Sequence, residues 1–236
     1  MSQSMQAIGI IGAMQVEVDH LIADLRDCVR SDHAHTTFYQ GILGEQPVVV
    51  VRSGVGKVNA AACAQLLIDH FQPASIINTG IAGAVASNLG IGDVVIASDC
   101  CEHDVDVTNL SYPKGQIPDM DVFAFQADAQ LVRTCLASAR ASQAFPQVHQ
   151  GRIVSGDQFV HTRAKKEELW RDYHALCCEM EGAAIAHVCY LNQLPFAIVR
   201  TISDAADEVS SLDYPSFEKK AADANARLIE LVLSSM

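Results

Sequence analysis

The chain has 236 residues and a mass of 25.4 kDa, and 50% of its residues are hydrophobic, which is enough to bury a sizeable core. Lys and Arg number 16 against 28 Asp and Glu, so the formal net charge is −12 and the isoelectric point is about 5.0. This balance argues against a partner that is nucleic acid or an anionic membrane, because nothing offsets the repulsion of phosphates. It is compatible with a small polar or nucleoside ligand held by hydrogen bonds.

The eight cysteines do not predict a disulfide framework. No CxxC pair occurs, and most of the cysteines lie in apolar runs such as 95–101 and 175–180, where a thiol packs as a small hydrophobic group. The N-terminus lacks the basic region of a signal peptide, and the longest apolar stretches are shorter than a membrane span. We therefore expect a reduced protein of the cytoplasm.

The first half of the chain alternates short apolar runs with helical patterns. Residues 7–14 predict a buried strand, and from Met14 the apolar residues follow a helical spacing. The Ala-rich run 57–71 predicts a helix, and 103–122 predicts a long irregular loop of the kind that serves a function or an interface. Further strands are expected at 35–44, 46–54, 74–80 and 92–101, with a Gly-rich loop at 80–85.

The second half repeats the alternation. Helices are expected at 127–141, 163–171, 181–192 and 216–234, and strands at 149–159, 175–180 and 195–204. No linker, low-complexity tract or repeat interrupts the pattern. We predict a single α/β domain over residues 1–236, a three-layer fold whose central twisted sheet is mixed, largely parallel and flanked by helices.

Ligands of such sheets bind at the carboxyl ends of the strands, and acidic residues follow several of the predicted strands. Glu17 follows the first strand, Glu181 follows the next to last, and Asp204 ends the last. Each has a structural alternative: the two glutamates open helices, where a carboxylate complements the helix dipole, and Asp204 could cap a short helix. Their convergence on one sheet edge favours a site. Asp157 is most simply a turn acid.

Three other motifs give weaker signals. The run GIAGAV (80–85) lacks the GxGxxG of a dinucleotide site. The run SGVGKVN (53–59) lacks the Ser or Thr of a Walker A motif, and it predicts a turn that begins a helix. His103, Asp104 and Asp106 could suggest metal ligands, but two acids in a loop without an HExxH pattern disfavour a catalytic metal.

The 103–122 loop also carries an apolar set in an otherwise polar stretch. Its members are Leu110, Tyr112, Ile117, Pro118, Met120 and Val122. An exposed apolar set of this kind marks an interface. We therefore predict a homodimer in which this loop completes the mouth of the partner's pocket.

Six segments keep the order and spacing of a known family. They are IGIIGAMQVEV (8–18), NTGIAG (78–83), HDVDVT (103–108), VSGDQF (154–159), CEMEGAAIAHV (178–188) and RTISDAAD (200–207). Together they resemble the bacterial methylthioadenosine/S-adenosylhomocysteine nucleosidases of the nucleoside phosphorylase/hydrolase superfamily. The EMEG and ISDAAD pair is specific to the superfamily, and GAMQVEV narrows it to the nucleosidases. The resemblance implies a nucleoside phosphorylase-like fold and an enzyme without a cofactor or metal.

The resemblance further implies that water cleaves the N-glycosidic bond of 5′-methylthioadenosine, S-adenosylhomocysteine and also 5′-deoxyadenosine, in methionine salvage and methyl-cycle detoxification. Asp204, helped by Ser203, would protonate N7 of the purine, and Glu17 would deprotonate the attacking water. Glu181 would bind the ribose hydroxyls, and Phe159 would stack on adenine. The other implied substrate contacts are Met14, Val55, Ile81, Ala82, Gly83, Val107, Val160, Glu179, Met180, Arg200, Ala206 and Tyr214, with Leu110 and Pro118 from a neighbouring subunit.

The chemistry agrees with two acids of this kind. Adenine leaves poorly as an anion, so its protonation lets the C1′–N9 bond break first and leaves an oxocarbenium-like sugar. The same logic, with one acid and one water-directing base, operates in glycoside hydrolysis.

Three alternatives remain open, and the first of them, a phosphorylase, is weighed at two residues. In phosphorylases of the superfamily an Arg and a Ser stand where this chain has Asn78 and Ile81; Ile cannot donate to phosphate, so water is the favoured nucleophile. Family nucleosidases also often carry Ser at the position of Ile81, which leaves a polar contact there in question. The alternatives are a purine nucleoside phosphorylase, an aminodeoxyfutalosine nucleosidase and a non-catalytic nucleoside-binding protein.

Overall fold

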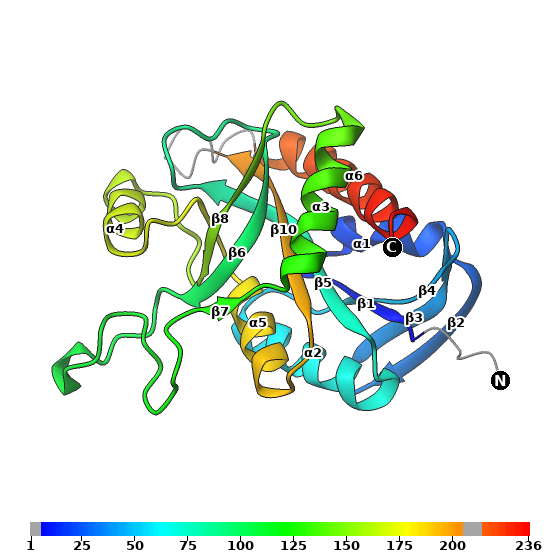
Figure 1. Cartoon of the computed structure of the whole chain (residues 1–236), viewed down its shortest axis with the longest axis horizontal. Coiled ribbons are helices and arrows are strands. Elements are labelled where there is room, and N and C mark those ends of the chain that lie inside the picture. The colour runs from blue at the N-terminus through cyan, green and yellow to red at the C-terminus, as the bar shows by residue number, and fades with distance from the viewer. Residues whose placement is uncertain (1–5, 205–213) are drawn as a thin grey trace.

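The computed structural model describes residues 6–204 and 214–236, and its elements follow the predicted alternation closely (Figure 1). The strands are β1 (Ile8–Gly12), β2 (Arg26–His33), β3 (Thr36–Leu43), β4 (Gln46–Arg52), β5 (Ser75–Ala84), β6 (Val94–Glu102), β7 (Phe125–Gln126), β8 (Val148–Ser155), β9 (Cys177–Glu179) and β10 (Phe196–Asp204). The helices are α1 (Gln15–Ala23), α2 (Lys57–Phe71), α3 (Ala129–Ser142), α4 (Arg163–Tyr173), α5 (Gly182–Leu191) and α6 (Tyr214–Ser234). Within these described ranges, no helix has the length and apolar character needed to cross a membrane.

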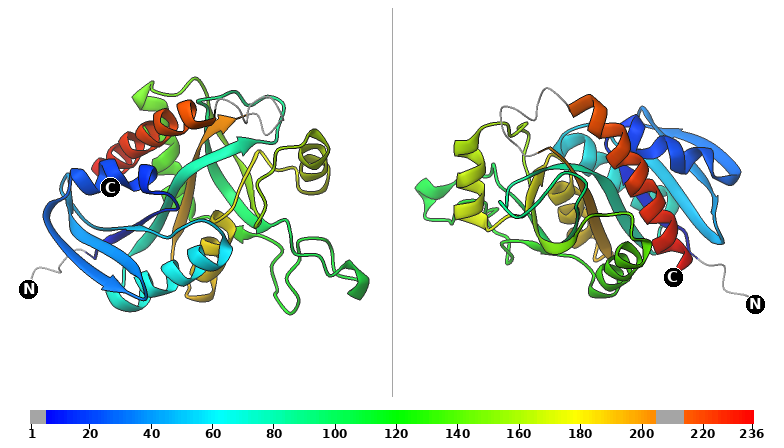
Figure 2. Two further views of the ribbon diagram at one scale, coloured as in Figure 1. Left: turned by 180° about the vertical axis from the view of Figure 1, so that it is seen from behind. Right: turned by 90° about the horizontal axis from the view of Figure 1, so that it is seen from above.

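The sheet is mixed, and its central pairings are parallel. β1 lies between β4 and β5 and is parallel to both, and β5 is also parallel to β10. β10 pairs antiparallel with β6. β6 pairs parallel with β8, and β8 pairs parallel with β9. β9 in turn pairs antiparallel with β5. Five strands therefore close into a ring, while β4, β3 and β2 extend the sheet on the other side (Figures 1 and 2). The predicted α/β fold with a mixed sheet is confirmed.

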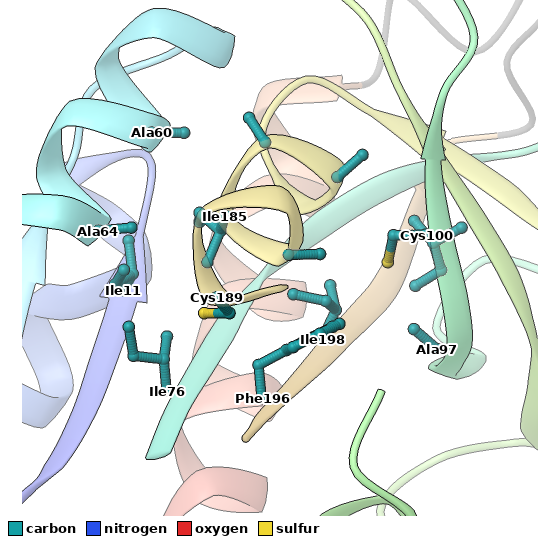
Figure 3. Close-up of a cluster of buried hydrophobic side chains, with 14 of the residues drawn as sticks. Ile11, Ala60, Ala64, Ile76, Ala97, Cys100, Ile185, Cys189, Phe196 and Ile198 are labelled. Atoms are coloured by element: carbon teal, nitrogen blue, oxygen red, sulfur yellow. The ribbon is translucent and has the colours of Figure 1, made fainter. Parts of the chain in front are cut away.

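Helices cover the sheet on two sides, which gives the three layers expected. One buried cluster joins the sheet to α2 and α5, and a second joins it to α1, α3 and α6. In the first cluster Ala60 and Ala64 of α2 face the sheet beside Ile185 and Cys189 of α5 (Figure 3). Small side chains let these two helices approach each other closely, and each large aliphatic residue buried with them contributes roughly 1.5–3 kcal/mol.

The Gly-rich segment 80–85 is not the loop that the sequence predicts, because β5 runs through it as far as Ala84. It pairs with β10 through Gly83, and Gly83 also pairs with Cys178 of β9. A Cβ on Gly80 would lie 2.6 Å from Oε1 of Glu17. The glycine therefore lets a strand approach a carboxylate closely, and it does not turn the chain.

The strands β2 and β7 were not predicted. β2 is an edge strand that pairs antiparallel with β3, and none of its residues is fully buried. Its sequence, RDCVRSDH, lacks the alternation of a half-buried strand, so only pairing with β3 makes it one. β7 consists of two residues paired with β6. The 103–122 segment is irregular, as predicted, apart from a short 3-10 helix at Thr108–Leu110.

Candidate active site

The carboxyl ends of β1, β5, β9 and β10 surround a cavity with a volume of about 310 Å³. Its lining residues are Ala13, Met14, Glu17, Val55, Ile81, Ala82, Gly83, Gln158, Phe159, Val160, Cys178, Glu179, Met180, Glu181, Ser203 and Asp204. All of these except Ala13, Gln158 and Cys178 are among the substrate contacts that the family resemblance implies. Each of these three directly precedes a predicted residue in the chain, which was the available signal.

Several predicted substrate contacts do not line the cavity of this chain. Among the described residues, those outside it are Val107, Leu110, Pro118 and Arg200. The first three belong to the 103–122 segment, which extends away from the body of the molecule in Figure 1. Ala206 lies outside the described residues, and of Tyr214 only its place at the start of α6 is described.

Glu17 is buried, and three backbone N–H groups hold its carboxylate. Oε2 accepts hydrogen bonds from Ala13 (2.7 Å) and Met14 (2.9 Å) at the start of α1, and Oε1 accepts one from Ile81 of β5 (3.1 Å). Burial raises the pKa of Glu17, while the Arg200 charge and these hydrogen bonds act in the opposite direction. Glu17 thus binds backbone N–H groups at the start of α1, as expected of an acid at a helix start. It also faces the cavity, where its carboxylate is suited to accept a proton.

Glu179 and Arg200 form a buried ion pair beside the cavity, with 2.6 Å between Oε2 and Nη2. The same oxygen accepts the N–H groups of Glu181 (3.0 Å) and Gly182 (2.8 Å) at the start of α5, and Oε1 accepts a hydrogen bond from Ser155. Burial alone would raise the pKa of Glu179, but the Arg200 guanidinium and these hydrogen bonds hold it below its usual value. Glu179 therefore anchors α5 and Arg200, and Arg200 faces this partner instead of lining the cavity.

Glu181 directly precedes α5 but does not cap it with its side chain. Its Oε1 accepts a hydrogen bond from the backbone N–H of Gly56, at the start of α2, over 2.8 Å. Burial, followed by the charge of Glu179, raises the pKa of Glu181 to about 7. Because Glu179 binds the start of α5, helix capping does not account for Glu181, and its carboxyl group faces the cavity.

Asp204 ends β10, and its side chain is buried on the same cavity as Glu17. Ser203 Oγ donates a hydrogen bond of 2.8 Å to Asp204 Oδ2. The pairing of β10 with β5 shifts register between Ile202 and Asp204, and such an irregularity re-aims a side chain at the end of a strand. The end of β10 thus presents an acid whose neighbouring hydroxyl donates to it.

One wall of the cavity is apolar and partly open. Phe159 is 55% exposed there, beside the buried Val160 and the partly buried Met180. An exposed aromatic ring next to aliphatic surface offers a stacking face to a planar base. The cavity therefore combines an apolar wall with acids on its other walls.

The weaker motifs have structural explanations. The 53–59 run turns at Gly56 (φ 96°) and begins α2 at Lys57, as predicted. Asp104 accepts hydrogen bonds from Lys57 Nζ and from the N–H of Asp157. In the described part of the chain, the His, Asp and Glu side chains close enough to share an ion are His20, Asp24 and Glu230, which lie between α1 and α6 and not on the cavity.

Comparison with known proteins finds relatives over nearly the whole chain. The model of the phosphorylase superfamily matches residues 7–234. The 5′-methylthioadenosine/S-adenosylhomocysteine nucleosidase of an Exiguobacterium species is 41% identical over 226 residues, which cover 95% of this chain and 96% of the relative. The protein of the same name from Staphylococcus aureus is 40% identical over 230 residues, covering 97% of this chain and all (100%) of the relative.

Solved structures agree with these relatives. The Neisseria meningitidis 5′-methylthioadenosine/S-adenosylhomocysteine nucleosidase, in complex with methylthio-immucillin-A, superposes with a TM-score of 0.94 at 35% identity, covering 98% of this chain and 100% of that one. A futalosine hydrolase of Helicobacter pylori superposes with a TM-score of 0.93 at 30% identity, covering 98% and 99% of the two chains. The fold is thus shared by enzymes with more than one named substrate.

Proposed function

The chain belongs to the phosphorylase superfamily and, within it, to the 5′-methylthioadenosine/S-adenosylhomocysteine nucleosidases, and from this premise we propose that it hydrolyses the N-glycosidic bond of these two adenosine thioethers. The products are adenine and the corresponding thioribose. The observation that carries the proposal is the placement of Glu17 and Asp204 on one cavity. A water-directing base and a leaving-group acid are the two groups that such a hydrolysis needs.

In the proposed mechanism Asp204 delivers a proton to N7 of adenine while Ser203 holds its carboxyl group. The C1′–N9 bond then breaks, and positive charge develops on the ribose. Glu17 takes a proton from the water that attacks C1′. An ionised Glu181 accepts hydrogen bonds from the ribose hydroxyls and stabilises the developing charge. Phe159 stacks on the base, with Val160 and Met180 completing the apolar wall.

Water is the proposed nucleophile because the described cavity wall contains no Lys or Arg that could hold phosphate. Arg200 pairs with Glu179 and also donates to the side-chain oxygen of Asn78. Asn78 donates to the carbonyl oxygen of Ile11 over 2.8 Å. The groups at the positions where phosphorylases bind their anion are therefore either apolar, as at Ile81, or already occupied.

We propose that residues 1–236 form one nucleosidase domain that works in the cytoplasm, in methionine salvage and methyl-cycle detoxification, and that also accepts 5′-deoxyadenosine. A homodimer would bring Leu110 and Pro118 of one subunit to the pocket mouth of the other. The exposure of Leu110, at 62%, supports this arrangement, whereas Ile117, Met120 and Val122 of the predicted apolar set pack against the core of their own chain. Sedimentation at micromolar concentration tests it, and a fully active monomer would contradict it.

Adenine release tests the reaction itself. The protein should release adenine from methylthioadenosine and S-adenosylhomocysteine at rates that do not change when phosphate is added. A rate that requires phosphate would indicate a phosphorylase. Because one solved relative is a futalosine hydrolase, aminodeoxyfutalosine belongs in the same assay. Activity on that compound alone would move the function to the second candidate, and release of adenine from none of them would indicate a binding protein.

A further inference from the structure

The helix α2 begins at Lys57, two residues after Val55 of the cavity wall. The ammonium group of Lys57 is 2.7 Å from Oε2 of Glu102 and 2.7 Å from Oδ1 of Asp104. These groups are largely shielded, with exposed side-chain fractions of 19% for Lys57, 11% for Glu102 and 15% for Asp104. Shielded, charge-assisted hydrogen bonds of this length are stronger than surface ion pairs. Lys57 therefore holds the end of β6 and the start of the 103–122 segment against α2.

A closed ring of contacts extends from the same lysine. The backbone N–H of Lys57 donates to Oδ1 of Asp157 over 2.8 Å, and the N–H of Asp157 donates to Oδ2 of Asp104 over 2.9 Å. The contact between Lys57 Nζ and Asp104 Oδ1 closes the ring. Lys57, Asp104 and Asp157, which come from three different segments, thus each bind the other two. Asp157, which the sequence suggests is only a turn acid, is thus fixed at both its N–H and its carboxylate.

This ring adjoins the cavity at two places. Asp157 precedes Phe159 by two residues, and Gly56, which directly precedes Lys57, donates its N–H to Oε1 of Glu181. Resting on the proposed function, in which Phe159 stacks on the base and Glu181 binds the ribose, we propose that Lys57 is a positioning residue. It fixes the distance between the base-binding and ribose-binding sides of the cavity through Asp104, Asp157 and the start of α2.

The charges explain why a cation is needed here. Burial would lower the pKa of Lys57, but its hydrogen bonds to Asp104 and Glu102 raise it, so the group stays protonated. Without that charge, two shielded carboxylates would face each other, with the His187 ring, 3.3 Å from Glu102 Oε1, as a further neighbour. Repulsion between them would move the 103–104 segment away from α2, and Asp157 would follow because Asp104 holds its N–H.

The test compares Lys57→Met, which keeps the length of the side chain but removes its charge, with Lys57→Arg, which keeps the charge. We expect Lys57→Met to lower kcat/KM for methylthioadenosine by up to roughly 100-fold, the size of loss that a misplacement of about 1 Å can cause. Most of the loss should appear in KM, with a matching loss of adenine affinity, since Asp204 and Glu17 are not in the ring. Lys57→Arg should recover most of the affinity.

Arg152→Met is the matched control. Arg152 pairs with Asp99 in a similarly shielded position, with exposed fractions of 27% and 13%, and does not line the cavity. Its loss should lower the melting temperature and leave KM unchanged. A Lys57→Met enzyme that loses stability like the control but keeps its KM and adenine affinity would overturn the positioning role. Adenine release by the wild-type protein is scored separately, so failure of the proposed function would be visible before any variant is compared.

Discussion

The starts of α1 and α5 both bring buried carboxylates to the cavity, but they divide the work differently. At α1, Glu17 alone accepts the N–H groups of Ala13 and Met14, just before the helix, and also faces the cavity. At α5, Glu179 binds the N–H groups and Arg200, while Glu181 faces the cavity and accepts one backbone hydrogen bond, from Gly56 just before α2. The same local position, an acid at a helix start, therefore serves anchoring and chemistry together in one case and separately in the other.

The difference shows in the charge states of the carboxyl groups. The pKa of Glu179 is lowered because Arg200 and several donors offset its burial, whereas burial raises the pKa of Glu181 to about 7. Glu179, which anchors the start of α5 and pairs with Arg200, stays ionised. A neighbour relieved of that task can respond to a ligand or to pH near neutrality. Substitutions at these acids separate the two tasks.

The largest expected effect comes from the acid that anchors neither helix. Asp204→Asn preserves the shape of the group at N7 but cannot deliver a proton, so adenine would have to leave as an anion. We expect kcat to fall roughly 10²–10⁴-fold or more, with KM changed much less, because the lost interaction forms mainly in the transition state. Steady-state kinetics with methylthioadenosine measure both constants.

A substrate with a better leaving group provides the control for Asp204→Asn. A p-nitrophenyl thioriboside needs no protonation, so the variant should cleave it far better, relative to wild type, than it cleaves adenine substrates. Equal losses on both substrates would mean that Asp204 is only a wall of the pocket.

Glu17→Gln should affect chemistry and anchoring together. The amide cannot take a proton from water, so we expect a roughly 10²–10⁴-fold loss in kcat. Its NH₂ group would also face backbone donors that the carboxylate now satisfies, which should cost about 1–3 kcal/mol of unfolding free energy. Urea unfolding and kinetics on the same preparation measure the two effects.

Asp128→Asn is a matched control for Glu17→Gln, because Asp128 accepts the N–H groups of Gln130 and Leu131 at the start of α3, away from the cavity. Asn caps helices about as well as Asp, so this variant should keep both its stability and its activity. Near-normal turnover in Glu17→Gln would leave Glu17 as a helix anchor only.

Glu179→Gln should be mainly a stability variant. It weakens the hold of the side chain on the N–H groups at the start of α5 and leaves the buried Arg200 without its counter-charge. Breaking a buried ion pair in this way costs about 3–5 kcal/mol. Glu168→Gln removes a partner of Lys114 and Lys165 at partly exposed positions and should cost no more than about 1 kcal/mol. Equal losses of unfolding free energy in the two variants would contradict the role of Glu179 as the anchor of α5 and Arg200.

Much of this arrangement could be predicted from the sequence because it depends on short-range patterns. The helix expected at 57–71 is α2 with the same bounds, since its apolar period is clear. The sequence predicts that Glu17 and Asp204 lie close together, because parallel strands end at one edge of the sheet. Apolar periodicity and strand direction were sufficient for these features.

The features that were missed depend on partners far away in the chain. β2 is a strand only because β3 pairs with it, and 80–84 stays extended because β10 lies beside it. The contact of Gly56 with Glu181 spans 125 residues, so no local pattern indicates it. For the same reason the sequence could not show that Glu179, and not Glu181, binds the start of α5.

The smallest expected effect is a pH dependence that Glu181 should impose on substrate binding. Its pKa of about 7 means that the ionised fraction falls as pH decreases below neutrality, by up to tenfold per pH unit. If ionised Glu181 accepts hydrogen bonds from the ribose hydroxyls, kcat/KM should rise as pH increases through about 7 and then level off.

The free energy of unfolding should change with pH in the opposite direction. The raised pKa favours the protonated folded state, so this group's contribution to stability is greatest at low pH and is lost as pH rises from about 4.5 through about 7. Glu181→Gln, measured by the same kinetics and by thermal unfolding across pH 5–9, should flatten both profiles. A rise in kcat/KM that persists unchanged in this variant would assign the titration to another group and leave Glu181 without the separate role that distinguishes the start of α5 from that of α1.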